Sequence, residues 1–160
     1  MAKPSAVFTP DKLQAGDCLL YRPKGIFGQL IRIKTWHKIS HVEVYAGNGM
    51  SYASRDGLGV NLYPVRLSEL AWVLRPSKLP ANITFSYAKS MIGTPYGWLD
   101  LLAFIGLPVN FPGIVCSAFA TNIYRTDLDW PIFPTDTATD IAPFEFLTLV
   151  GNGFNVIYQA

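Results

Sequence analysis

The sequence predicts a single α+β domain that covers residues 1–160. Two patterns lead to this prediction: short strand-like segments follow one another in the first half of the chain, and helix-like segments dominate the second half. Turn-forming residues between the first strands indicate an antiparallel meander. The length fits one domain, since domains cluster near ~100–150 residues, and it requires no disulfide or metal to stabilise the core.

The strand at residues 41–46 has the clearest pattern in the chain. Its residues alternate, so that Val42 and Val44 point to one face and His41, Glu43 and Tyr45 point to the other. The sequence Gly-Asn-Gly that follows it signals a hairpin turn. Further strands are predicted at 17–21, 50–54, 60–65, 72–75 and 155–158.

Helix-like periodicity predicts four helices, at residues 26–35, 84–92, 98–105 and about 115–124. The first of these has a broad apolar face, and basic side chains line its other side. We interpret the basic side as a solvated surface in preference to a site for an anionic ligand.

The composition excludes several classes of protein. Hydrophobic residues make up 50% and charged residues 15% of the chain, which excludes a disordered polypeptide. The net charge of +2 is too weak to indicate a nucleic-acid partner. The mean hydropathy of +0.24 is high, so either the core is large or some apolar surface meets a partner or a lipid.

The sequence contains neither a predicted membrane span nor a secretory signal. The longest nearly apolar stretch, residues 101–109, has about half the ~20 residues that a membrane-spanning helix needs. Residues 1–11 lack the apolar core of a signal peptide. We therefore expect a cytoplasmic or virion-associated monomer, and membrane contact is not favoured.

The two cysteines, Cys18 and Cys116, suit a reducing compartment better than a disulfide scaffold. Neither has a Cys or His neighbour at metal-ligand spacing, so the sequence predicts no metal and no cofactor. Cys18 alternates within an apolar strand and is interpreted as structural.

Cys116 is the candidate nucleophile, because a Pro-Gly turn precedes it and opens a helix. The positive end of a helix dipole lowers the pKa of a thiol in the first turn. Unpaired backbone N–H groups at the same place can stabilise an oxyanion. The alternative interpretation is a small buried residue that packs like alanine.

His41 is the candidate base, since the strand would hold its side chain in one direction. Glu43 shares its face and would orient the imidazole, directly or through a water. Residues i and i+2 of a strand lie about 6.6 Å apart, which is not ideal for a direct hydrogen bond. Ser54, Arg55 and Asp56 compete for the orienting role, and a satisfied histidine and an exposed carboxylate remain the alternatives.

Four segments in this order resemble a known family: Gly16-Asp17, residues 40–47, Gly93-Thr94-Pro95-Tyr96 and Val115-Cys116-Ser117. They look like the circularly permuted branch of the NlpC-type papain-like cysteine hydrolases, which includes YiiX-like bacterial and phage proteins and relatives of lecithin–retinol acyltransferase. The histidine precedes the cysteine here, which is the permuted order. The resemblance extends from about residue 16 to residue 147.

The resemblance implies a small antiparallel barrel-like sheet packed against helices, with Cys116 as nucleophile and His41 as base. The third polar residue of relatives would fall near Ala53, which cannot serve, so Glu43 takes this role with Ser54 in reserve. Tyr96 matches a tyrosine that follows a Gly-x-Pro turn, and it would contribute to the oxyanion site or else pack as a core aromatic.

The expected activity is cleavage of an amide bond in a peptide or a peptidoglycan fragment, through an acyl-enzyme intermediate. Two alternatives stay open. One is a lipid acyl hydrolase or acyltransferase, which the high hydropathy would suit. The other is an inactive papain-like module that binds a partner.

Overall fold

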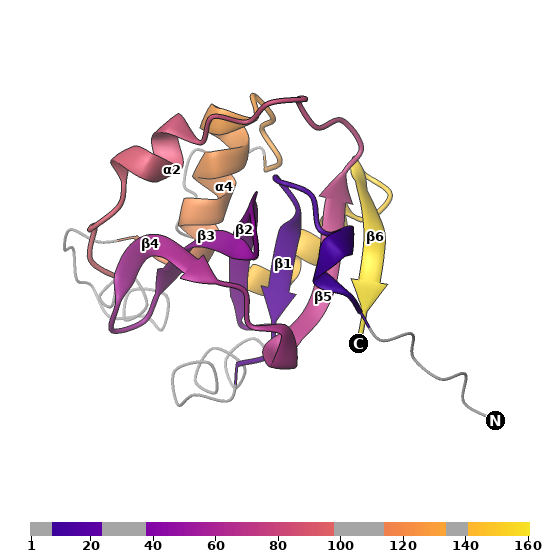
Figure 1. Ribbon diagram of the computed structural model, residues 1–160, viewed down its shortest axis with the longest axis horizontal. Helices are drawn as coiled ribbons and strands as arrows, with labels where there is room; N and C mark the ends of the chain where they lie inside the picture. Colours follow the sequence, from indigo (N-terminus) through magenta and orange to yellow (C-terminus); the bar gives the residue numbers. More distant parts are fainter. Residues whose placement is uncertain (1–7, 24–37, 98–113, 134–140) are drawn as a thin grey trace.

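The computed structural model describes residues 8–23, 38–97, 114–133 and 141–160. In this part of the chain, six antiparallel strands form one sheet in the order β4-β3-β2-β1-β5-β6, and helices pack against it (Figure 1). The strands are β1 (Cys18–Tyr21), β2 (His41–Gly47), β3 (Met50–Arg55), β4 (Gly59–Pro64), β5 (Leu70–Pro76) and β6 (Phe154–Gln159). The helices are α2 (Ser86–Ser90), α4 (Cys116–Asp127) and three 3-10 turns, η1 (Pro10–Lys12), η2 (Leu67–Glu69) and η4 (Pro143–Leu149).

The strands β2, β3 and β4 form the predicted meander. The turn between β2 and β3 contains Asn48 at φ 53° and Gly49 at φ 74°. Positive φ at both central residues is what a type I′ hairpin turn requires, and Asn-Gly adopts it at low cost. All six strands predicted from the sequence are present, with ends that differ by one or two residues.

Two predicted helices can be compared with the structure. The helix expected at 115–124 is present as α4 and extends to Asp127. The helix expected at 84–92 is shorter, since only α2 at Ser86–Ser90 forms. It begins late because Phe85 has left-handed backbone angles, with φ 52°. The predicted helices at 26–35 and 98–105, and the apolar stretch at 101–109, lie outside the described residues.

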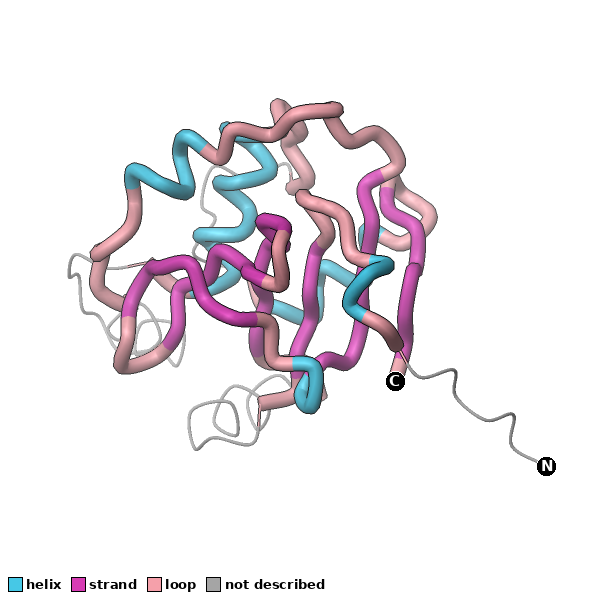
Figure 2. The backbone as a smooth tube through the Cα atoms, in the orientation of Figure 1, coloured by secondary structure: helices cyan, strands magenta, loops and turns pink. Residues whose placement is uncertain are grey.

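The sheet is open, so the expected barrel-like closure is wrong for the described part of the chain. Strands β4 and β6 stand at opposite ends of the sheet and do not pair with each other. One face of the sheet is covered by α4, which packs on β2 and β3. The loop of residues 77–85 carries the chain from β5 over the end of the sheet to α2 (Figure 2).

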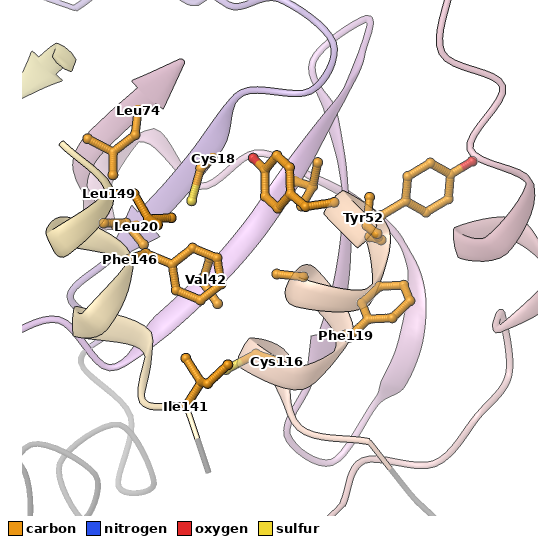
Figure 3. Packing of buried hydrophobic residues seen from close by; sticks show 14 of the residues in the cluster. Cys18, Leu20, Val42, Tyr52, Leu74, Cys116, Phe119, Ile141, Phe146 and Leu149 are labelled. Atoms are coloured by element: carbon orange, nitrogen blue, oxygen red, sulfur yellow. The ribbon is translucent and has the colours of Figure 1, made fainter. Parts of the chain in front are cut away.

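Both faces of the central strands are buried. On the α4 side, Val42 and Val44 pack in one apolar cluster with Phe119 and Ile123. Both cysteines belong to this cluster, Cys18 on β1 and Cys116 at the start of α4 (Figure 3). On the opposite side a second cluster contains Leu19, Tyr21, Tyr45, Leu70 and Val73.

The two clusters confirm the alternation that the sequence predicts for β2. They also explain why all four residues of β1 are apolar or aromatic and fully buried. Among the described residues, no helix has both the length and the hydropathy needed to cross a membrane.

Candidate active site

Cys116 is the first residue of α4, and its side chain is 2% exposed. The preceding residue, Val115, is extended (φ −79°, ψ 160°), so the helix begins abruptly at the cysteine. The first N–H groups of a helix have no partner within it, so backbone donors surround the thiol at this end. The Pro-Gly turn proposed to open this helix lies outside the described residues.

The chain before Cys116 is anchored to two neighbouring segments. The Ser54 hydroxyl on β3 donates a hydrogen bond of 2.5 Å to the carbonyl oxygen of Ile114. Ile114 also donates its N–H to the carbonyl of Pro95 (3.2 Å) and accepts from the N–H of Gly97 (3.3 Å). These bonds determine where α4 starts relative to the sheet, and therefore where the sulfur lies.

His41 lies beside Cys116, so the first residue of β2 is brought together with the first residue of α4. Burial alone would lower the pKa of His41. The charge of the Cys116 sulfur, the hydrogen bond to it and the contact with Glu43 outweigh burial and raise the pKa of His41 to about 9. The surroundings of His41 therefore favour a proton on the imidazole near neutral pH.

Glu43 contacts His41 directly, with 3.0 Å between Oε1 of the carboxylate and Nε2 of the imidazole. The expectation that the two-residue spacing disfavours a direct bond is wrong, because both side chains are long enough to lean toward each other on one face of β2. Since Nε2 is engaged by Glu43, Nδ1 is the ring nitrogen that remains for the sulfur.

Glu43 is fully buried, and its two oxygens accept hydrogen bonds from several side chains. Arg55 donates its Nε to Oε1 at 2.9 Å, and Arg66 donates Nη2 to the same oxygen at 3.3 Å. The Ser51 hydroxyl donates to Oε2. Burial would raise the pKa of Glu43, but the hydrogen bonds and charges of His41 and Arg55 lower it to about 2, so the carboxylate is ionised near neutral pH.

Tyr96 is buried beside the nucleophile. It packs with Val115 and Ala118, the residues that flank the start of α4. Burial first, and then the negative charges of Cys116 and Asp56, raise the pKa of Tyr96 well above its ordinary value. Its hydroxyl therefore keeps its proton and can act as a hydrogen-bond donor.

The structure brings four of the five candidate residues into one chain of interactions: Cys116, His41, Glu43 and Tyr96. Ser54, the fifth, lies in a different place from the one its proposed roles would need. Its hydroxyl donates to the carbonyl of Ile114, so Ser54 holds the chain segment before Cys116 and does not orient the imidazole.

Two partners of Glu43, Ser51 and Arg66, did not emerge from the sequence, whereas Arg55 appeared only as a competitor of Glu43. A signal for them exists: an acidic residue on a buried strand face requires cations or hydroxyls from neighbouring strands. Ser51 belongs to β3, the strand that pairs with β2, and Arg66 follows β4.

Cys18 has a different environment. It is fully buried, and burial raises its pKa well above the ordinary value, although a hydrogen bond with Tyr124 opposes this. A thiol in this state is not nucleophilic at neutral pH. Its place in the apolar cluster agrees with a structural role.

Within the described ranges, no group of three or more His, Cys, Asp or Glu side chains is arranged to hold a metal ion. No protein-family model matches this chain, and no curated protein matches it either.

Proposed function

We propose that the protein is a cysteine hydrolase that cleaves an amide bond with the Cys116 sulfur as nucleophile. The observation that carries the proposal is the continuous set of contacts from Cys116 to His41 and from His41 to Glu43. A nucleophile, a base and a group that orients the base are the three parts that nucleophilic catalysis by a thiol requires. The resemblance to permuted NlpC-type hydrolases supports the same assignment.

The reaction would proceed from an ion pair in which His41 holds the proton of Cys116. The thiolate attacks the carbonyl carbon, a C–S bond forms, and the carbonyl oxygen becomes an oxyanion. The backbone N–H of Cys116 and the hydroxyl of Tyr96 are the donors proposed for that oxyanion. The His41 imidazolium then protonates the leaving nitrogen as the C–N bond breaks.

An acyl-enzyme on Cys116 remains after the amine has left. His41, now neutral, takes a proton from a water molecule, and the resulting hydroxide attacks the thioester carbonyl. Collapse of this second tetrahedral intermediate breaks the C–S bond, releases the carboxylic acid and returns the sulfur to its ion pair with His41. Glu43 stabilises the imidazolium in both halves of the reaction and is not itself protonated.

The substrate favoured by the resemblance is a peptide amide, including the peptides of bacterial cell walls. A second candidate, an acyl ester of a lipid, is favoured by two exposed apolar residues near the site. Leu58 is 70% exposed in the β3–β4 turn, and Ile92 is 47% exposed after α2. The two segments are adjacent, because the N–H of Val60 donates to the carbonyl of Thr94 (2.8 Å), two residues before Tyr96.

Thiol reactivity tests the proposal without knowledge of the substrate. Iodoacetamide is applied at pH 6, and the alkylation rates of Cys116 and Cys18 are measured separately by peptide mass spectrometry. We expect Cys116 to react at least about tenfold faster than a model thiol of pKa ≈ 8.5, because the proposed mechanism requires His41 to take up the thiol proton. A rate for Cys116 no greater than that of the model thiol or of Cys18 would overturn the proposal.

A substrate panel separates the two candidate reactions. Peptidoglycan-derived peptides and short-chain acyl lipids are incubated with the protein and with Cys116→Ala as control. Cleavage of the peptides alone supports the amidase, and cleavage of the lipids alone supports the acyl hydrolase. Either activity counts only if Cys116→Ala abolishes it.

A further inference from the structure

Arg55 binds the same carboxylate oxygen that receives the His41 imidazole. Its Nε lies 2.9 Å from Oε1 of Glu43, and so does its Nη2, while Nε2 of His41 lies 3.0 Å from that oxygen. The Arg55 side chain is 12% exposed, so solvent screens this contact only in part. One oxygen of Glu43 is therefore shared between a guanidinium and the base.

The position of Arg55 is held on its other sides. Its second nitrogen, Nη2, donates to the carbonyl of Pro64 at 3.0 Å, and its guanidinium lies 4.3 Å from the ring centroid of Tyr63. A planar group held in this way presents its donors in one direction, which a flexible cation would not do. Arg55 therefore constrains the orientation of Glu43 as well as its charge.

Other charged and titratable groups face this cluster from several elements. Cys116 reaches His41 from α4, and the ring of Tyr21 on β1 lies 5.9 Å from it. Arg66 approaches Oε1 at 3.3 Å, but its side chain is 32% exposed and it also pairs with Glu69 at 3.1 Å. Arg66 is therefore the weaker cation at this oxygen, and Arg55 the stronger.

We propose that Arg55 is a positioning residue that holds Glu43 toward His41 and offsets part of its charge, which limits how firmly the imidazolium is retained. The proposal deepens the proposed function and rests on it. A carboxylate that already pairs with a guanidinium attracts an imidazolium less than a free carboxylate does. His41 then loses its proton at a lower alkaline pH than it would beside a Glu43 without Arg55.

The proposal gives Arg55 and Glu43 effects of opposite sign. Glu43 has a pKa of about 2, so it stays ionised near neutral pH even after one cation is removed. In Arg55→Met, Ser51 and Arg66 still hold the Glu43 carboxylate in place, less of its charge is offset, and the midpoint of the His41 titration rises. In Glu43→Gln that charge is absent, and the midpoint falls. A purely structural role for Arg55 would not produce this reversal.

The test follows the titration of His41 by NMR in protein labelled at histidine. The chain has only two histidines, and His37→Gln assigns the remaining resonance to His41. We expect a midpoint near 9 in the unchanged protein and an increase of about half to one pH unit in Arg55→Met. The matched control is Arg75→Met, which removes the arginine of another buried ion pair, with Asp17, and should leave the midpoint unchanged.

An unchanged or lowered midpoint in folded Arg55→Met would overturn the proposal. If that variant does not fold, Arg66→Met decides: the proposal requires an increase of the same sign and smaller size, and no increase contradicts it. A midpoint near 6.5 in the unchanged protein would instead mean that the pair between His41 and Cys116 is absent, and the proposed function itself would fail.

Discussion

The regions around the two cysteines contain the same kinds of interaction. Each region has a buried carboxylate that is paired with an arginine: Asp17 with Arg75 beside Cys18, and Glu43 with Arg55 beside His41, the neighbour of Cys116. In each region a hydroxyl also donates to the backbone carbonyl two residues before the cysteine. Tyr124 donates to Gly16, and Ser54 donates to Ile114.

The two regions differ in the imidazole. His41 lies between the sulfur and the carboxylate at Cys116, whereas Tyr124 is the side chain that hydrogen-bonds to Cys18. Burial and the nearby Asp17 raise the pKa of Cys18 and keep its thiol neutral. A buried thiol near a carboxylate keeps its proton, and the imidazole of His41 is the group beside Cys116 that could accept one.

The two carboxylates differ in the same sense. Arg75 binds both oxygens of Asp17 at 2.8 Å, and the N–H of Gln14 donates to one of them, so Asp17 is satisfied by groups that only hold the fold. In Glu43, by contrast, one oxygen, Oε1, contacts His41 as well as an arginine. The comparison therefore predicts that changes near Cys18 affect stability, and changes near Cys116 affect turnover.

Replacing each cysteine by alanine should give the largest contrast. Cys116→Ala is expected to lower kcat/KM by about 10⁴-fold or more while leaving the fold intact, because no nucleophile remains. Cys18→Ala should keep kcat/KM and lower the free energy of unfolding by about 1–2 kcal/mol, through lost packing and the lost contact with Tyr124. Kinetic assays and urea unfolding of both variants measure the contrast, and comparable losses of turnover would contradict it.

Neutralising each carboxylate should give the second largest contrast between the two regions. Glu43→Gln is expected to lower kcat/KM by about 10- to 100-fold, because the imidazolium loses its counter-charge. Asp17→Asn should leave kcat/KM within about twofold and lower the free energy of unfolding by roughly 2 kcal/mol, because Arg75 loses a buried partner. Comparable losses of turnover in the two variants would mean that Glu43 acts only through the fold.

The acid dependence of stability should identify Glu43 as an ionised buried group. Its pKa falls from 4.5 to about 2 on folding, so its contribution is complete above pH 4.5 and is lost as the pH falls toward 2. Between pH 6 and pH 3 the unchanged protein should lose about 2 kcal/mol more unfolding free energy than Glu43→Gln does. Urea titrations at the two pH values test this, and equal losses would show that Glu43 is not held ionised by folding.

The smallest effects are expected from the two hydroxyls. Ser54→Ala and Tyr124→Phe each remove one hydrogen bond to a backbone carbonyl, that of Ile114 or that of Gly16, and should cost about 1 kcal/mol of stability. Only Ser54→Ala should also lower kcat/KM, by about two- to fivefold, because the chain segment that positions the Cys116 sulfur is held less firmly. Equal kcat/KM values in the two variants would show that the Ile114 anchor does not position the sulfur.

The sequence is sufficient to predict the site wherever a local pattern determines geometry. The alternation at residues 41–46 places His41 and Glu43 on one face, since the period of two in a strand does not depend on the rest of the fold. The Pro-Gly turn before Cys116 likewise predicts that the thiol stands at a helix start, where the structure places it. These features need no knowledge of distant contacts.

The parts that escape the sequence depend on long-range pairing. Arg55 and Arg66 reach Glu43 from positions 12 and 23 residues away, and only the register of β2, β3 and β4 brings them there. The direct bond between His41 and Glu43 depends on side-chain rotamers, which spacing does not determine. The open sheet could not be predicted either, because closure depends on whether the edge strands β4 and β6 meet.

His41 and Glu43 lie on one strand and are separated only by Val42. The register of β2 therefore determines the position of both side chains at once. A slip of β2 by one residue would turn both polar side chains into the α4 cluster and both valines away from it. Such a chain would lose the core and the chemistry together. Molecules with β2 in the wrong register would therefore be inactive. Any activity measured on a preparation would come only from the molecules with the correct register.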